Sequence, residues 1–322
     1  MKKVLIDSDT GLDDAMAFVH GMLMPEIDIV GVTSGHGNAA TDDCAYHAIE
    51  LIELMGKDIP VVRGASAPLI SGWGAAPEVH GPYGRGPLGK LDYAHKVTPG
   101  YGPVFMLEQI RRYGSDLTIV AMGRLTNLAL AYCLDPELMK TVGSIMWLGG
   151  VHSASGNTSA VGEANLEGDP EAARIVLRPE LPVTIVTLDV SMAARISEAD
   201  LQSLRDVRHP GVQHLLKVLP FYLDFYESIL GVRECSGHVG LLLAMVAHPS
   251  LILQTHTLPV HVETAGEFTR GMLVVDRRTL RSETDPQDTD DGLRIVWKAD
   301  TARYHRLFME ALLGADQREV AP

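Results

Sequence analysis

The chain has 322 residues, 46% of them hydrophobic and 21% charged, which is the balance of a globular protein that can bury a large core. Its formal net charge of -14 argues against nucleic-acid polymers and anionic membranes as partners. No apolar run is long enough to span a bilayer, and the sequence opens directly on a strand pattern instead of a signal peptide, so we expect a cytoplasmic protein. The three cysteines are widely separated and are expected to be reduced thiols.

Strand and helix patterns alternate along the chain. Apolar, often β-branched runs predict strands at 4–6, 27–33, 59–62, 117–121, 144–148 and 183–186. Helical spacing predicts helices starting at 13 and 170, and over 40–55, 103–113, 128–131 and 136–140. The later chain predicts helix over most of 200–229, helices at 238–247 and 301–313, and strands near 258–262, 271–275 and 293–296.

This order predicts one α/β domain over 1–322, with a doubly wound, mostly parallel sheet, helices on both faces and an appended helical region. Pro210 and Pro220 are expected to break the helical stretch over 200–229. The segment 64–102 is rich in Gly and Pro, and its His80, Tyr83 and Trp73 favour a lid over a solvated linker.

The first strand leads into a turn with four carboxylates, those of Asp7, Asp9, Asp13 and Asp14, and Gly11 lets the chain turn tightly there. One capping aspartate would be ordinary, but four acids within eight residues of a hydrophobic strand indicate a hard cation with oxygen ligands. Such a cation can also help to deprotonate a water molecule.

Polar groups follow several other predicted strands. They are Asn38, the main-chain carbonyl of Met122, and a loop with Asn157, Glu163 and Asn165. Because the carboxyl ends of parallel strands meet in one crevice, these groups and the four acids are expected to surround one ligand, and such a lining suits a polyol. Ligands from distant loops, including a carbonyl, favour calcium over magnesium.

The run Asp7-Ser8-Asp9-Thr10-Gly11-Leu12-Asp13-Asp14-Ala15 resembles the D-x-D-P-G-x-D-D-A signature of the inosine-uridine preferring nucleoside hydrolases. Supporting matches follow in the same order: Gly37-Asn38, His80-Gly81, Leu125-Thr126-Asn127, Gly149-Gly150, Glu163-Ala164-Asn165, Asp169-Pro170-Glu171-Ala172-Ala173 and Thr269-Arg270-Gly271-Met272. Together they cover nearly the whole chain. The resemblance implies hydrolysis of the N-glycosidic bond of a ribonucleoside to free base and ribose.

The resemblance also implies a role for each matching residue. Asp9 would be the general base for a calcium-bound water and would touch the metal together with Asp14 and the Met122 carbonyl. The remaining matches would bind substrate: Asp13 the ribose 2′-hydroxyl, Asn157 and Glu163 the 5′-hydroxyl, Asn165 and Asn38 the ribose face, with His80 also at a motif position. Asp7 and Gly11 would shape the turn, His238 is a candidate acid for the leaving base, and related enzymes imply a homodimer or homotetramer.

One departure affects the metal shell. The family normally completes it with the Asp of a His-Asp-Pro motif, whereas this chain reads His238-Val239-Gly240. Water or a neighbour such as Glu234 could compensate, or calcium affinity could fall. Val239 therefore keeps two alternatives open: a hydrolase of a modified nucleoside or other N-riboside, and a noncatalytic ribose or nucleoside binder that has lost the metal. The aromatic run around Tyr222, Phe225 and Tyr226 is equally compatible with base stacking and with core packing.

Overall fold

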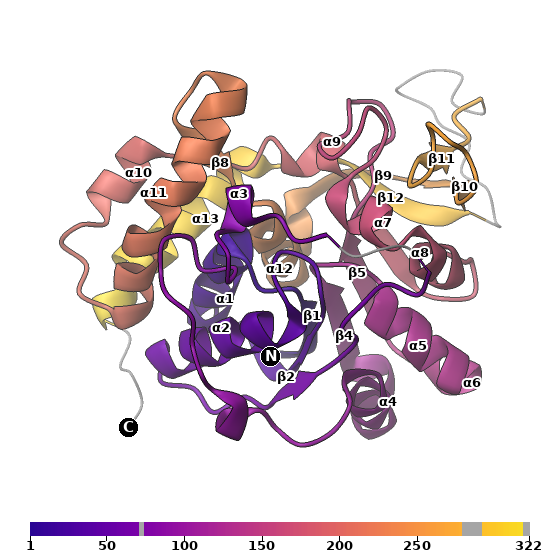
Figure 1. Ribbon diagram of the computed structural model, residues 1–322, viewed down its shortest axis with the longest axis horizontal. Coiled ribbons are helices and arrows are strands. Elements are labelled where there is room, and N and C mark those ends of the chain that lie inside the picture. The colour runs from indigo at the N-terminus through magenta and orange to yellow at the C-terminus, as the bar shows by residue number, and fades with distance from the viewer. Residues whose placement is uncertain (71–73, 279–291, 318–322) are drawn as a thin grey trace.

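The computed structural model describes residues 1–70, 74–278 and 292–317. An eight-stranded sheet runs through its centre in the order β3-β2-β1-β4-β5-β6-β12-β9, and its neighbours are parallel except for β9, which is antiparallel to β12 (Figure 1). The strands are β1 Lys2–Ser8, β2 Ile27–Ser34, β3 Val61–Arg63, β4 Leu117–Ala121, β5 Ser144–Leu148, β6 Val183–Val186, β9 Ile252–Leu258 and β12 Leu293–Ala299. The predicted doubly wound, mostly parallel sheet is confirmed.

Helices cover both faces of this sheet. One hydrophobic cluster holds α1 Leu12–Leu23, α2 Thr41–Leu54, α11 Pro210–Leu230, α12 His238–Ala247 and α13 Thr301–Leu313. The other holds α4 Gly102–Tyr113, α5 Thr126–Leu134, α6 Pro136–Met139 and α8 Pro170–Val176. Side chains of β1 alternate between the clusters, with Val4 and Ile6 in the first and Leu5 in the second, as a strand buried on both faces requires.

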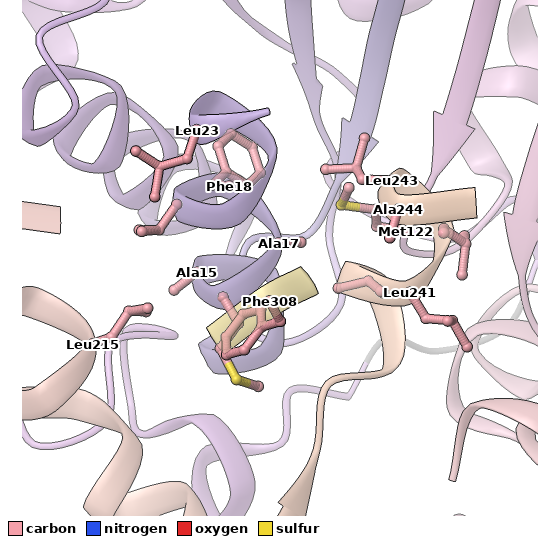
Figure 2. Packing of buried hydrophobic residues seen from close by; sticks show 14 of the residues in the cluster. Ala15, Ala17, Phe18, Leu23, Met122, Leu215, Leu241, Leu243, Ala244 and Phe308 are labelled. Carbon is pink, nitrogen blue, oxygen red and sulfur yellow. The ribbon is translucent and has the colours of Figure 1, made fainter. Parts of the chain in front are cut away.

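The first cluster is dense around α1. Ala17 and Phe18 of α1 lie among Leu241 and Leu243 of α12 and Phe308 of α13, all fully buried (Figure 2). Each large side chain buried in this way contributes about 1.5–3 kcal/mol relative to exposure. This packing fixes the start of α1, and therefore the acidic turn in front of it, against the body of the protein.

Short elements complete the fold. They are the helices α3 Pro77–His80, α7 Ala164–Gly168, α9 Leu188–Ser191 and α10 Glu198–Ser203, and the antiparallel pairs β7 Arg195–Ser197 with β8 Glu234–Ser236 and β10 Val260–Val262 with β11 Leu273–Val275. In the part of the chain that the structure describes, no helix combines the length and the hydropathy needed to cross a membrane. A single domain over 1–322 stays a prediction.

One expectation about the chain path is wrong in part. Pro210 begins α11, but Pro220 lies inside that helix without ending it. Proline costs about 3 kcal/mol or more inside a helix. Here Leu219, Tyr222 and Leu223 around it are buried against the first cluster, so tertiary packing outweighs that local cost.

The segment 64–102 is more structured than its composition suggests. It contains α3, and its Arg85 side chain is buried in an ion pair with Glu50 of α2. His80 is buried beside Tyr222 of α11, with ring centroids 5.7 Å apart. Trp73 lies outside the described residues. The segment therefore packs on the body next to the acidic turn, and its action as a lid stays a prediction.

Candidate active site

A cavity of about 460 Å³ opens at the carboxyl ends of β1, β4 and β5. The residues predicted to surround one ligand converge here, and the lining includes Asp9, Asp13, Asp14, Asn38, Met122, Asn157, Glu163, Asn165 and His238. Three predicted residues, Asp7, Gly11 and His80, lie behind this lining and support it. The convergence follows from the parallel sheet, which brings the ends of β1 and β4 side by side through the pairing of Asp7 with Ala121.

Asp14 is held by the turn that precedes it. Its Oδ1 accepts a hydrogen bond from Ser8 Oγ at 2.8 Å, and its Oδ2 accepts from the Gly11 backbone N–H at 2.8 Å and from Asn38 Nδ2 at 3.1 Å. Gly11 lies at the strand-to-helix turn with a negative φ of -106°, so this turn does not use the left-handed backbone that favours glycine. A Cβ at this position would lie 2.5 Å from Asn38 Nδ2 and from His80 Nδ1, so the close approach of these two side chains requires glycine.

Asp9 sits between two glycines. Its Oδ2 accepts from the Asn38 backbone N–H at 2.9 Å. A Cβ on Gly37 would overlap this carboxylate, and a Cβ on Gly123 would lie 2.6 Å from Oδ1. Gly37 and Gly123 were not predicted as site residues, although Gly37 belongs to the Gly37-Asn38 match and Gly123 directly follows Met122.

Asp13 is the carboxylate with a free acceptor. Its Oδ1 is buried and has no hydrogen-bond partner among the described residues. His80 Nδ1 lies 4.0 Å away, but this nitrogen accepts the Leu12 backbone N–H and therefore carries no proton for Asp13. A buried acceptor at the cavity wall without a partner is costly in the empty protein and is suited to a ligand hydroxyl.

Three of the lining carboxylates, those of Asp9, Asp13 and Asp14, cannot all ionise easily together. Burial, followed by the charge of Asp14, raises the pKa of Asp9 to about 8. Burial, followed by the charges of Asp14 and Asp9, raises the pKa of Asp13 well above its usual range, and burial raises that of Asp14. A cation held among these groups would stabilise all three negative charges, so the donor set fits a hard cation.

The Met122 carbonyl follows β4 beside the acidic turn, since the Met122 backbone N–H donates to the Asp7 carbonyl at 2.8 Å. This carbonyl already accepts a hydrogen bond from Asn165 Nδ2 at 2.9 Å. The same amide donates to the Leu148 carbonyl at 3.0 Å. A carbonyl oxygen has two lone pairs, so Met122 keeps one for another partner. Asn165 therefore holds the predicted metal-binding carbonyl in position.

The loop before α7 is fixed mainly by Glu163. Its carboxylate accepts from the backbone N–H groups of Gly150, Asn165 and Leu166 at 2.8–3.1 Å, so it caps α7 while lining the cavity. Burial raises the pKa of this carboxyl. Asn157 Oδ1 accepts from the Ala164 N–H at 3.0 Å, which ties the loop to the same helix start.

His238 faces the cavity from the first turn of α12 with both ring nitrogens engaged. Nδ1 lies 2.9 Å from Ser191 Oγ, and Nε2 lies 2.7 Å from the Tyr226 hydroxyl. Burial, with a smaller contribution from the charge of Arg195, lowers the pKa of His238 to about 3, so the ring is neutral at physiological pH. Ser191 carries no sequence signal that could have found it, whereas Tyr226 belongs to the aromatic run.

The aromatic run packs in the core and also lines the cavity, and its stacking on a base stays a prediction. Tyr222 and Tyr226 are buried in the hydrophobic cluster and also line the cavity together with Phe225. Val239 is fully buried in the same cluster and is not among the lining residues. Glu234 does not line this cavity either, so it is not a replacement ligand in this arrangement.

The fold and the site together define an α/β protein whose cavity is lined by buried carboxylates and amides suited to a polyhydroxylated ligand. The family model described as inosine-uridine preferring nucleoside hydrolase matches residues 4–306. The chain is 33% identical over 316 residues to a probable uridine nucleosidase 2 of Arabidopsis thaliana, covering 97% of this chain and 98% of that one.

Solved structures give the same result. A plant nucleoside hydrolase superposes with a TM-score of 0.89 at 29% identity, covering 97% of this chain and 99% of that one. A purine-preferring ribonucleoside hydrolase from Gardnerella vaginalis superposes with a TM-score of 0.88 at 28% identity, covering 98% and 100%. The chain belongs to the inosine-uridine preferring nucleoside hydrolase family. It is a hydrolase of ribonucleosides, as the resemblance of its motifs implied.

Proposed function

We propose that this hydrolase releases the base of uridine and related ribonucleosides by adding water to C1′ of the ribose. Asp9 takes a proton from the attacking water, the bond from C1′ to the base nitrogen breaks, and the base leaves with a proton. Uridine is the first candidate because the Arabidopsis relative, 33% identical, is described as a probable uridine nucleosidase. Carboxylates close to the ribose favour the positive charge that develops on the sugar in the transition state.

The unpartnered Oδ1 of Asp13 is the observation that carries this proposal. It is a buried anionic acceptor at the cavity wall, and a ribose 2′-hydroxyl is a donor that would satisfy it. Asn38, Asn157, Glu163 and Asn165 line the same cavity and would bind the other hydroxyls. A ribose therefore fits the polar half of the cavity, and the aromatic half is left for the base.

Calcium is the cofactor that we propose for this site. Asp9, Asp14 and the Met122 carbonyl would hold it, because the raised pKa values of the two carboxyls favour a neighbouring cation. When bound, a calcium ion polarises a water molecule and makes it easier to deprotonate. Val239 supplies no oxygen, so we expect weaker calcium binding than a shell with a fourth protein ligand would give.

The hydrogen-bonded pair of His238 and Tyr226 is the proposed source of the proton for the leaving base. The neutral His238 ring cannot donate from both nitrogens, so one of the hydrogen bonds to Ser191 and Tyr226 must run toward the ring. Tyr226 lines the cavity directly, so its hydroxyl can give its proton to the leaving base. The resulting tyrosinate would accept a hydrogen bond from His238 Nε2–H and regain a proton from water after the base has left.

Free base released from uridine, cytidine, inosine and adenosine, measured with added calcium, tests the proposal. We expect uridine to give the highest kcat/KM and Asp9→Asn to abolish the release. Lack of activity on all four nucleosides would contradict it. Val239 favours a second candidate substrate, a modified nucleoside or other N-riboside, because the Asp that it replaces in the family normally also contacts a ribose hydroxyl. Release of reducing sugar from a panel of such ribosides, compared with release from the four common nucleosides, distinguishes the two candidate substrates.

Assembly and location stay predictions. We expect a homodimer or homotetramer in the cytoplasm, with neither nucleic-acid polymers nor membranes as partners, since the net charge of -14 opposes both. Light scattering of the purified protein measures the assembly directly.

A further inference from the structure

Three ionisable side chains cluster outside the active-site cavity. His47 and Glu50 belong to α2, and His214 belongs to α11. Both histidines are buried and Glu50 is partly buried. One nitrogen or oxygen from each of the three lies within 4.8 Å of the others.

The two imidazoles face each other through their Nε2 atoms, which are 3.2 Å apart. His47 Nδ1 lies 3.3 Å from the Thr10 carbonyl, which can only accept a hydrogen bond, so Nδ1 carries the proton and Nε2 presents a lone pair. In the metal-free protein, a proton on His214 Nε2 can bridge the pair. Two imidazole nitrogens bound to one tetrahedral zinc ion at 2.0–2.1 Å are about 3.3 Å apart, so the pair already has the separation that zinc requires.

Glu50 is the third member of the cluster. It follows His47 by three residues, so both project from one face of α2. Its Oε2 lies 3.9 Å from His214 Nδ1, too far for a hydrogen bond. Its carboxylate is instead held by Arg85, with Nε donating to Oε2 at 2.9 Å and Nη2 donating to Oε1 at 2.5 Å.

We propose that His47, Glu50 and His214 form a second cation site, for zinc or a similar transition metal, and that the metal competes with Arg85 for Glu50. Two imidazoles and one carboxylate form an established zinc ligand set that leaves a fourth position open. Imidazole nitrogens select such metals over calcium, which prefers an all-oxygen shell. Burial lowers the pKa of His214 to about 4 and that of His47 well below its usual range, so both are neutral and able to bind a metal at pH 7.

Two positively charged side chains near the cluster oppose the binding of a metal ion. Arg85 is paired with Glu50, and the positive charges of Arg85 and Lys217 both act on His214. Arg85 also donates to the Gly89 carbonyl and so fixes part of the segment that carries His80. A metal bound to Glu50 would break the ion pair that holds Arg85 in this position. His47 provides a second link, because it contacts the carbonyl of Thr10, which lies within the acidic turn. The site therefore connects metal binding with two supports of the active site.

Cobalt(II) is the probe for this site because four-coordinate cobalt absorbs visible light much more strongly than six-coordinate cobalt. The full-length protein is titrated with cobalt in the presence of excess calcium, which occupies the carboxylate site. We expect one equivalent to give the intense four-coordinate spectrum, and zinc to displace it. His214→Gln should weaken cobalt binding at least tenfold, whereas Asp9→Asn and the exposed control His95→Gln should leave it unchanged.

A second variant, with the opposite expected effect, controls for the possibility that His214→Gln weakens cobalt binding only because it misfolds. Arg85→Gln frees Glu50 and removes a positive charge, so it should strengthen cobalt binding about tenfold, an effect that loss of structure cannot imitate. A wild-type spectrum of the weak six-coordinate type overturns the proposal. Equal cobalt affinity in His214→Gln and wild type, or no gain in Arg85→Gln, overturns it as well. None of these outcomes depends on the nucleoside that the enzyme hydrolyses.

Discussion

Asp13→Asn is expected to stabilise the protein while it removes most of the activity. The Asp13 carboxylate is buried, its Oδ1 has no hydrogen-bond partner among the described residues, and the charges of Asp14 and Asp9 repel it. An unsatisfied buried polar group costs about 1–3 kcal/mol, and more when it is charged. The asparagine removes the charge and keeps the shape, so without calcium we expect a gain of about 1–2 kcal/mol, or a rise in Tm of about 2–4 °C.

The stability gained by Asp13→Asn should increase as the pH rises above the ordinary pKa of an aspartate. The folded-state pKa of Asp13 is raised above its ordinary value of 3.8, so its carboxylate destabilises the folded protein above pH 3.8. The advantage of Asp13→Asn is therefore present at neutral pH and disappears below about pH 4. Thermal unfolding in a chelating buffer across this range measures it.

The same Asp13→Asn substitution should lower kcat/KM, although it raises the stability of the metal-free protein. A hydrogen bond to a charged acceptor contributes about 1.5–3 kcal/mol, so the loss of the ribose contact should lower kcat/KM by about 10- to 150-fold. The exposed control Asp116→Asn should change neither quantity. An unchanged kcat/KM for Asp13→Asn, or a lower Tm in the chelating buffer, would refute the assignment of Asp13 Oδ1 as an unsatisfied substrate acceptor.

Three further measurements test the rest of the site. Gly123→Ala places a Cβ 2.6 Å from Asp9 Oδ1 and should lower kcat at least tenfold, whereas Gly89→Ala, which meets nothing within 4 Å, should be neutral in the same assay. Tyr226→Phe leaves His238 Nε2 without its 2.7 Å partner and should lower kcat more than it changes KM, and equal effects on both would contradict the proton-transfer role. Removal of calcium with a chelator should reduce the activity, and added calcium should restore it whereas magnesium should not. Full activity of the metal-free protein would exclude calcium as the cofactor.

The order of the elements could be predicted because the central strands β1, β4, β5 and β6 are buried on both faces and read as apolar runs. Helices such as α1 and α4 show helical spacing of their apolar residues. The convergence of Asp9, Asn38 and Met122 was also predictable, since it depends only on parallel strands ending at one edge. Pro220 was misjudged because local helix rules do not include the buried contacts of α11 with the rest of the protein.

Interactions between distant side chains could not be predicted from the sequence. Ser191 approaches His238 across 47 positions of the chain, and no periodicity or motif marks that contact. Gly11 was predicted to shape the turn, whereas the approach of Asn38 and His80, which leaves no room for a Cβ, exists only in the folded structure. A motif thus identifies which residues belong to a site more reliably than it explains what each of them does there.

The valine at position 239 changes the balance of charge in the site more than its geometry. It is buried among apolar side chains, so the missing carboxylate leaves no gap in the cavity wall. A fourth carboxylate would add to the repulsion among Asp9, Asp13 and Asp14, each of which already has a raised pKa. The metal-free site is therefore easier to fold with valine than with aspartate, and the same change removes a ligand from the cation. For the proposed calcium site we therefore expect Val239→Asp to raise the calcium affinity and to lower the Tm of the metal-free protein, which calcium titration and thermal unfolding in a chelating buffer measure.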